Sequence, residues 1–272
     1  MLNKVVVKYD GSQYFGWQVQ RGKNRNVKTV ASVINKEVSK INKRKTEVVA
    51  SGRTDRKVHA LGQVFHFKND FDIPCDRLKR ALNNALADDI EVISVEEVDK
   101  DFHARFSAKS KEYHYYLNMG KYDLFKKDYI TQYNKALDYA KMQEAAKLII
   151  GRHDFKNFNT TPLSEKANQK RTIYKLEIEK QEDLLIFKIK GDSFLRNMVR
   201  MIVGVLVYIG ANKYNIKDLE NLLKKDNPSK EAYNIEPQGL YLVKVNYEEE
   251  IWTIFTRIQK DVIMLLEMKK IT

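Results

Sequence analysis

A polar loop between two apolar segments carries the residues best suited to chemistry. It reads Ser51-Gly-Arg-Thr-Asp-Arg-Lys-Val-His-Ala60 and places Asp55 two positions after Arg53. On a strand-to-loop turn, a carboxylate beside a cation is stabilised in its charged form by that neighbour. A carboxylate held in this way acts as a nucleophile or as a general base. On the residues alone, an ordinary surface ion pair is the simpler interpretation, and both interpretations stay open.

The histidines and the cysteine give little support to metal chemistry. Cys75 is the single cysteine, so it forms no disulfide within the chain and anchors no zinc site of the cysteine type. We expect no metal and no cofactor, and we expect His59 and His153 to fix loops by hydrogen bonds. A metal-dependent nuclease built on Asp10, Asp55 and His59 is the least favoured alternative, because their spacing offers no cluster of carboxylates. We interpret Asp10, which follows a strand, as a turn residue.

The net charge indicates an anionic partner. In 272 residues, 49 Lys and Arg stand against 36 Asp and Glu, which gives a formal net charge of +13. Residues 21–45 alone hold nine cations and one acid, a segment that favours RNA or DNA phosphates, with a solvated lysine-rich face as the alternative. The longest apolar run, residues 201–209, is far shorter than the roughly 20 residues of a membrane span. We expect a soluble protein of a reducing, cytoplasmic compartment.

The elements around the loop follow an alternating pattern in the first half of the chain. Thr29 is a candidate cap for a helix whose apolar residues recur at helical spacing, and Pro74 suits the first turn of a second helix. Four strands are expected at 2–9, 46–51, 63–68 and 90–98. Their order is β-α-β-β-α-β, which is typical of a ferredoxin-like unit with its helices on one face of an antiparallel sheet.

The second half repeats this theme less regularly. Strands are expected at 111–119, 171–180, 184–190 and 239–246, and helices at 134–150, 196–209 and 216–225. Helix 196–209 is apolar nearly all round and is therefore expected to be buried. We predict an α+β fold of two ferredoxin- or RRM-like units with their sheets side by side and the active cleft between them. The predicted domains are 1–105, 106–250 and an amphipathic helical tail at 251–272, which packs on the chain's own body or forms a dimer contact.

Several motifs occur in the order of one known family. Gly52-Arg-Thr-Asp55 with Val58-His-Ala60 resembles the catalytic motif of the tRNA pseudouridine synthase A (TruA) family. The flanking motifs agree over roughly residues 2–247. They are Tyr9-Asp-Gly11 with Gly16-Trp-Gln18, Phe102-His-Ala-Arg105, Tyr113-His-Tyr115, Gly151-x-His153-Asp-Phe155, Phe194-Leu-Arg-Asn197 with Arg200, and Gly239-Leu-Tyr-Leu242.

The resemblance implies an isomerase that converts uridine to pseudouridine in the anticodon stem-loop of tRNA, at nucleotides 38 to 40. Enzymes of this family break the C1′–N1 bond, turn the uracil and rejoin it through C5, without a cofactor or a required metal. The resemblance also implies a homodimer with tRNA as its partner and no association with a membrane. An inactive RNA-binding paralogue and a paralogue that modifies other uridines are the alternatives.

The resemblance assigns roles to four residues, and a physical argument adds a fifth. Asp55 matches the essential aspartate, as nucleophile or as base. Arg53 matches an arginine that holds the flipped nucleotide and pairs with the carboxylate. Tyr113 matches a tyrosine that stacks on uracil, with a half-buried strand tyrosine as the alternative. Leu240 matches an apolar residue near the base. Arg200, on an apolar helix, needs a partner because an unpaired buried charge is very costly, and Asp55 is our candidate.

One departure from the family lies beside Asp55. Arg56-Lys57 replaces the usual Ala-Gly, so we expect a loop of different form, a lowered pKa of Asp55 and attraction for phosphate. The aromatic residues Tyr14, Phe15 and Trp17 form either a packed corner or an RNA-stacking surface, and we favour packing.

Overall fold

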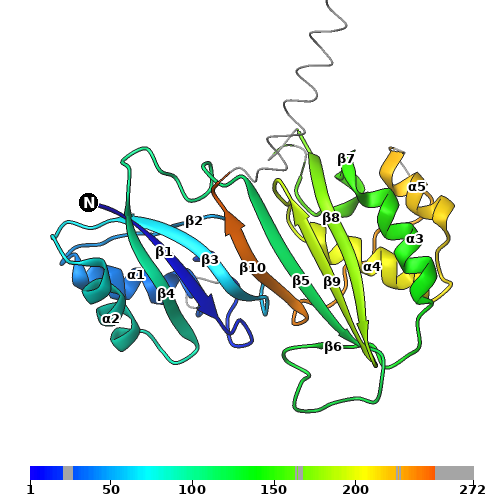
Figure 1. Ribbon diagram of the computed structural model, residues 1–272, viewed down its shortest axis with the longest axis horizontal. Coiled ribbons are helices and arrows are strands. Elements are labelled where there is room, and N and C mark those ends of the chain that lie inside the picture. Colours follow the sequence, from blue (N-terminus) through cyan, green and yellow to red (C-terminus); the bar gives the residue numbers. More distant parts are fainter. Residues whose placement is uncertain (21–26, 163, 165–167, 225, 227, 249–272) are drawn as a thin grey trace, which may run out of the picture.

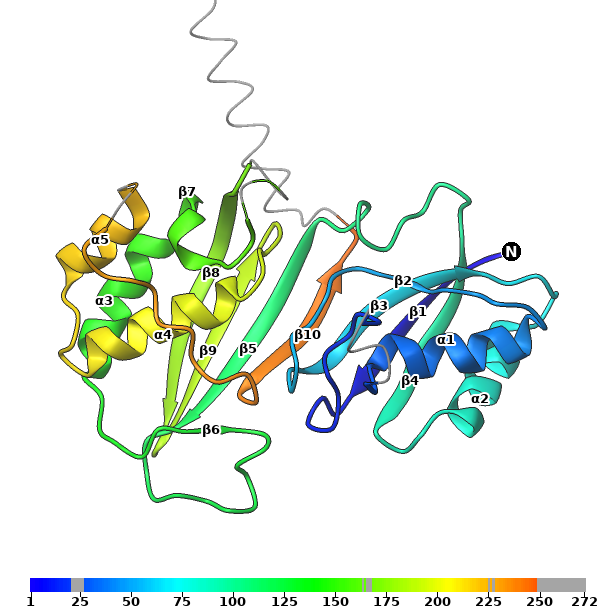
Figure 2. The same ribbon diagram turned by 180° about the vertical axis from the view of Figure 1, so that it is seen from behind.

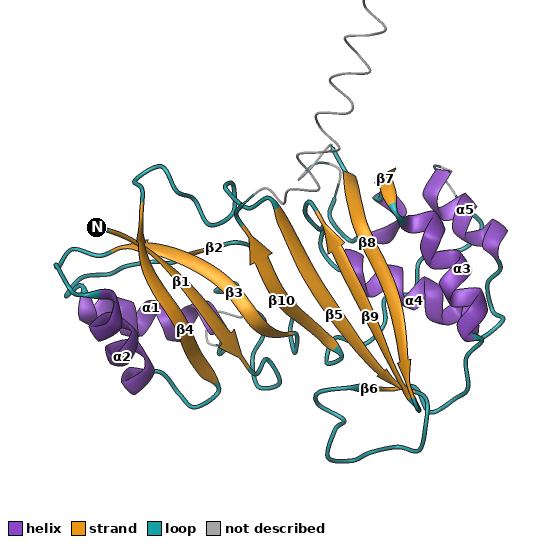
Figure 3. Cartoon of the chain, viewed as in Figure 1, coloured by secondary structure: helices purple, strands orange, loops and turns teal. Residues whose placement is uncertain are grey.

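Alternating burial along the strands builds one large sheet. In strand β1 (Leu2–Tyr9) every second residue is buried, from Asn3 to Tyr9, as the two-residue period of a strand requires. The computed structural model describes residues 1–20, 27–162, 164, 168–224, 226 and 228–248. These residues form an α+β fold on an open, ten-stranded sheet (Figures 1 and 3).

The main path of the sheet runs β4-β1-β3-β10-β5-β9-β8-β7, with β2 paired to β3 and β6 paired to β5. After β1, the strands are β2 (Val49–Ala50), β3 (His59–Lys68), β4 (Ile90–Val98), β5 (Ser110–Asn118), β6 (Thr131–Gln132), β7 (Gly151–Asp154), β8 (Lys170–Gln181), β9 (Leu184–Gly191) and β10 (Leu240–Asn246). The helices are α1 (Val30–Ile41), α2 (Cys75–Ala85), α3 (Tyr139–Ile149), the 3-10 turn η2 (Lys156–Phe158), α4 (Met198–Gly210) and α5 (Ile216–Lys224).

The last strand joins the two halves of the chain. β10 pairs antiparallel with β5 and parallel with β3, where Tyr241 lies opposite His59 and Leu242 opposite Ala60. The sheet is therefore mixed and continuous, which differs from the predicted pair of antiparallel sheets. An inserted β10 pairs both of its own edges and covers the edges that β3 and β5 would otherwise expose.

The helices α1 to α5 lie on the same face of the sheet (Figure 2). α1 and α2 cover the first half, while α3, α4 and α5 cover the second (Figures 1 and 2). Helix α4 is buried along most of its length, as its apolar composition predicts. A Cβ on Gly204 would lie 1.9 Å from the carbonyl oxygen of Tyr233, so this glycine allows the helix to approach the segment before β10 closely.

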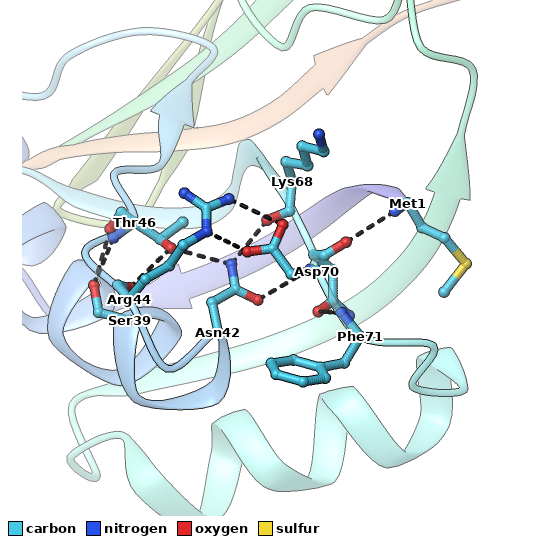
Figure 4. A network of polar contacts seen from close by, with 9 residues as sticks. Met1, Ser39, Asn42, Arg44, Thr46, Lys68, Asp70 and Phe71 are labelled. Atoms are coloured by element: carbon cyan, nitrogen blue, oxygen red, sulfur yellow. Dashed lines mark hydrogen bonds and ion pairs between the residues drawn. The ribbon is translucent and has the colours of Figure 1, made fainter.

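The strand predicted at 46–51 is mostly replaced by side-chain contacts from α1. The amide of Thr46 donates to Ser39 Oγ, and the amide of Val48 donates to Asn35 Oδ1, which leaves only Val49–Ala50 as β2. Figure 4 shows this turn, where the amide group of Asn42 donates to the Lys68 carbonyl and to Thr46 Oγ1. Side chains from the helix therefore satisfy backbone groups that a strand would have used.

Other boundaries also differ from those predicted. β3 begins at His59 rather than at 63, because its first residues pair with β10. The helix predicted at 134–150 begins at Tyr139, since Asn134 adopts a left-handed backbone with φ 58° and Asp138 caps the first turn. Thr29 caps α1 as predicted. The predicted tail at 251–272 lies outside the described residues.

Candidate active site

Loop 52–58, between β2 and β3, is held by the end of β1 and by the segment that follows it. The hydroxyls of Tyr9 and Thr54 lie 2.8 Å apart, and the amide of Trp17 donates to the Thr54 carbonyl at 3.1 Å. On the other side of Asp55, the amide of Lys57 donates to the carbonyl of Tyr14 at 3.3 Å. Asp55 therefore sits between two points at which the loop is attached to the rest of the first half.

Two glycines permit this close attachment. A Cβ on Gly11 would lie 2.0 Å from the Val58 carbonyl oxygen, and one on Gly16 would lie 2.6 Å from that of Thr54. Gly16 also has φ +81°, a conformation that residues with a side chain rarely adopt. The glycines of the N-terminal motif therefore position the loop that carries Asp55.

Asp55 pairs with Arg200 from α4. Arg200 Nη1 lies 3.6 Å from Asp55 Oδ2, which confirms the predicted contact. The exposed fraction is 32% for the Asp55 side chain and 13% for that of Arg200. The guanidinium is held in place by two more contacts, because its Nε donates to the Ile235 carbonyl at 2.7 Å and its Nη1 to Asn197 Oδ1 at 3.3 Å.

Burial raises the pKa of Asp55 above its ordinary value, and the positive charges of Arg200 and Arg196 offset part of that rise. This corrects the expectation of a lowered pKa. The cations that act on the carboxylate are Arg200 of α4 and Arg196 just before that helix, and not the adjacent Arg56 and Lys57. A carboxylate with a raised pKa is a stronger base, and a cation at ion-pair distance keeps its charged form accessible.

A pocket of about 470 Å³ opens beside Asp55. Its walls come from loop 52–58, from the start of α4 and from the segment before β10. The lining residues are Asp55, Arg56, Lys57, Arg196, Asn197, Arg200 and Pro237. One carboxylate thus faces four cations, an arrangement that suits an anionic ligand and a single acid–base or nucleophilic group.

Lys57 keeps the backbone form that glycine would allow. Its φ is 65°, in the left-handed region that a lysine adopts only at a cost. The expectation of a loop shaped differently from that of the family stays a prediction, and the φ of Lys57 is one that glycine adopts without strain. Arg56 stacks on Phe15, with Cζ 4.2 Å from the ring centroid.

Tyr113 lies on β5 next to this site. It is buried, its ring packs edge-on against Phe194 with centroids 5.1 Å apart, and burial raises the pKa of its hydroxyl, with a further contribution from the Asp55 charge. The hydroxyl therefore stays protonated in the neutral range. Leu240, also buried, starts β10 opposite Tyr115. Tyr113 and Asp55 are thus close enough to interact electrostatically.

Arg53 does not pair with Asp55 in the part of the chain that the structure describes. Its side chain is exposed, and the carboxylate contacts Arg200 instead. The predicted Arg53–Asp55 pairing is therefore wrong for this structure. The exposed guanidinium of Arg53, on the same loop as Asp55, remains available to a ligand.

Asp10 and His59 contact each other, with Asp10 Oδ1 3.2 Å from His59 Nδ1, and both bind the segments around the loop. Asp10 Oδ1 accepts from the Ser12 amide at 2.9 Å and Oδ2 from the Tyr129 hydroxyl at 2.8 Å. Burial alone would raise the pKa of Asp10, but these hydrogen bonds outweigh it and lower the pKa. His59 Nδ1 accepts from the Gly11 amide, so the neutral ring donates from Nε2 to the Asp128 carbonyl at 3.0 Å. The structural interpretation of Asp10 is confirmed.

The remaining candidates also have structural contacts. His59 makes the expected hydrogen bonds, and His153 Nε2 contacts the Ile150 carbonyl oxygen at 3.2 Å. Tyr14 and Trp17 are buried as predicted, whereas Phe15 is 41% exposed.

The described ranges contain no group of three or more His, Cys, Asp or Glu that could hold a metal. None of the helices traced in these ranges is long and apolar enough to cross a membrane.

The basic segment 21–45 is largely neutralised where it is described. Four of its cations face carboxylates, in the pairs Lys28–Asp89, Lys40–Glu37, Arg44–Asp70 and Lys45–Glu47 (Figure 4 for Arg44). Arg21, Lys23 and Arg25 lie outside the described residues. The charges that line the pocket instead come from loop 52–58 and α4.

Sequence reasoning missed three residues of the site. Arg196 and Asn197 line the pocket, and Phe194 packs on Tyr113. All three belong to the quoted motif before Arg200, and that motif was the available signal. Asn197 precedes α4 with φ 62°, so a left-handed turn aims this end of the helix at Asp55.

The chain is similar to known proteins over most of its length. A family model described as tRNA pseudouridine synthase matches residues 5–107 and 145–248. A tRNA pseudouridine synthase A of Thermoanaerobacter sp. (strain X514) is 40% identical over 244 residues, 89% of this chain and 98% of the relative. Proteins of that name from Exiguobacterium sp. (strain ATCC BAA-1283 / AT1b) and Listeria monocytogenes serotype 4a (strain HCC23) are 39% identical, each over 90% of this chain and 98% of the relative.

Among solved structures, a chain of a Cbf5-Nop10-Gar1 complex matches with 14% identity and a TM-score of 0.33. The match covers 75% of this chain and 45% of that chain, a similarity too low to support an argument.

Proposed function

The chain belongs to the tRNA pseudouridine synthase family, whose enzymes are isomerases, and from this premise we propose that it isomerises uridine in the anticodon stem-loop of tRNA. One observation carries the proposal. Asp55 is the one acid among the seven residues that line the pocket, and it is paired there with Arg200. A pocket with one carboxylate and four cations suits a single nucleotide that carries its phosphates with it.

The reaction needs only groups that the chain supplies. The C1′–N1 bond breaks, the uracil turns, a C5–C1′ bond forms, and N1 ends protonated while C5 loses its proton. Substrate and product have the same composition, so no cofactor, oxidant or reductant enters. Asp55 starts the reaction as nucleophile or as base, and its raised pKa makes it the more basic for that step.

Arg200 orients the carboxylate. Its guanidinium is fixed by the Ile235 carbonyl and by Asn197, so its position does not depend on the substrate. Fixed charges of this kind stabilise developing charge without reorganising during the reaction. Arg200 is therefore proposed as the residue that holds Asp55 in the reactive orientation.

Tyr113 and Leu240 form the place for the base. A uridine in a stem or loop must leave its stack to reach a carboxylate, and an aromatic ring can replace the stacking that it gives up. The protonated Tyr113 hydroxyl can donate a hydrogen bond, while Leu240 offers an apolar contact from the start of β10. The exposed Arg53 is proposed to hold the flipped nucleotide from the solvent side.

The site lies where the two halves of the chain meet. Asp55 comes from the first half and Arg200 from the second, which supports two α+β units, 1–105 and 106–250, with the reaction between them. We also propose that the enzyme acts as a homodimer, as the family resemblance implies. The proposed substrate of this homodimer is tRNA.

The test is to map pseudouridine at every position of an undermodified tRNA after incubation with wild type or with Asp55→Ala. We expect modification in the anticodon stem-loop by wild type and none by the variant. Product confined to other parts of the tRNA would refute the proposed target. The absence of product from wild type that demonstrably binds tRNA would refute the enzymatic proposal.

A further inference from the structure

Two cations beside Asp55 have no evident task within the protein. Arg56 and Lys57 line the pocket, yet neither forms an ion pair in the described residues. Other cations of the same half, such as Lys28 and Arg44, do have carboxylate partners. Neither Arg56 nor Lys57 shifts the pKa of Asp55, which responds to Arg200 and Arg196. Intramolecular pairing and tuning of the carboxylate therefore do not explain the two charges.

The local structure orients the side chain of Arg56 and gives Lys57 an unfavourable backbone conformation. Arg56 stacks on the half-exposed ring of Phe15, with Cζ 4.2 Å from its centroid, which orients the guanidinium and leaves its edges free to donate. Lys57 adopts φ 65°, a conformation that glycine would take without strain. Backbone strain at a ligand site is retained when the side chain contributes to binding.

We propose that Arg56 and Lys57 form a phosphate-binding subsite that contacts the RNA backbone on either side of the uridine inserted beside Asp55. This proposal rests on the proposed function and adds binding residues to it. Arg56 would grip one phosphodiester through its planar edge, and Lys57 the next as a point charge. Because the subsite reads the backbone and not the base edges, it strengthens binding for every inserted uridine alike.

The subsite predicts a change in the salt dependence of RNA binding. Removing one cation that binds a phosphate should reduce the slope of log K against log salt by about 0.7 to 0.9 and weaken binding by about three- to tenfold at moderate salt. The test variants are Lys57→Asn, which tolerates the left-handed backbone, and Arg56→Gln. The variants Lys57→Arg and Arg56→Lys keep the charge, and they should keep most of the slope.

Lys147→Gln, on the exposed side of α3, is the matched control for a change of net charge. Affinities are measured over a range of salt for the full tRNA transcript and for the isolated hairpin that contains the modified uridine. We expect the same decrease in affinity with both RNAs for Lys57→Asn and Arg56→Gln, and no decrease for the control. Thermal melting of each variant separates weaker binding from loss of fold.

Two results would overturn the subsite. One is an unchanged slope in both neutral variants. The other is a decrease in affinity seen with the full transcript alone, which would place the contacts on a distant part of the tRNA. The result for the proposed function is independent of this one, because binding is measured without turnover. If wild type lacks activity while the two neutral variants have a reduced slope of log K against log salt, the subsite is retained and the proposed reaction is refuted.

Discussion

Replacing Arg200 by methionine tests whether the ion pair at the pocket has the role assigned to it. At 3.6 Å, the attraction between the two charges is about 4–5 kcal/mol for an effective dielectric constant of 20. The Asp55 side chain is 32% exposed, so screening and desolvation reduce the net value to about 1–2 kcal/mol. Loss of the hydrogen bond to the Ile235 carbonyl adds about 1 kcal/mol.

Arg200→Met should therefore lower the free energy of unfolding by about 2–3 kcal/mol, or the melting temperature by about 4–10 °C. Loss of the group that orients the carboxylate should lower the rate of pseudouridine formation by about a hundredfold under single-turnover conditions. Chemical denaturation and a radiometric or mass-shift assay on an undermodified transcript give the two values.

The same variant has a pH signature. Asp55 must be ionised to act, so the rate falls as the pH drops through its pKa. Burial raises that pKa and Arg200 lowers it, so removal of Arg200 should move the acid limb of the rate profile to higher pH. Arg200→Lys keeps a positive charge and should show a smaller displacement. An unchanged rate and an unmoved acid limb in Arg200→Met would refute the role of the pair.

Further predictions concern the support of the site and its chemistry. Gly16→Ala should cost about 2 kcal/mol of stability by denaturant titration, and it should lower activity, because its Cβ would lie 2.6 Å from the Thr54 carbonyl oxygen at φ +81°. Tyr113→Phe should have a free energy of unfolding within about 1 kcal/mol of wild type, yet form pseudouridine at least about tenfold more slowly. Equal rates would show that the hydroxyl has no role in the reaction. Exhaustive treatment with a chelator, followed by an activity assay in metal-free buffer with monovalent salt to keep the tRNA folded, should leave the rate unchanged, and restoration by one particular added metal would contradict a cofactor-free reaction.

Local sequence signals predicted most elements of the fold. Strands β1 and β4 have the predicted bounds, and Thr29 caps α1, because alternation and capping depend on neighbouring residues. The position of β10 between β3 and β5 depends on pairing between residues 125 to 182 positions apart, such as Leu240 with Tyr115 and Tyr241 with His59, and no local pattern encodes it. The shortening of β2 also depends on contacts outside the strand, because the amides of Thr46 and Val48 donate to side chains of α1 and not to a neighbouring strand.

Part of the site followed from a physical argument. A charge on an apolar helix requires a partner, and this requirement predicted the contact between Arg200 and Asp55. Adjacency in sequence was a poor guide by comparison. The pKa of Asp55 is lowered by Arg196 and Arg200, which are distant in the sequence, and not by the neighbouring Arg56 and Lys57. The basic segment shows a related limit, since Asp70 and Asp89 pair with Arg44 and Lys28 from distant positions in the sequence, and contact of this segment with phosphates stays a prediction.

The central claim is that the Asp55 carboxylate starts the isomerisation of a uridine held in this pocket. Single-turnover pseudouridine formation by Asp55→Asn, with tRNA affinity measured on the same protein, tests it most directly, because the amide keeps the shape of the side chain and removes its charge. The account predicts tRNA binding within a few-fold of wild type and no detectable product. Product formed by Asp55→Asn at a rate near that of wild type would contradict it.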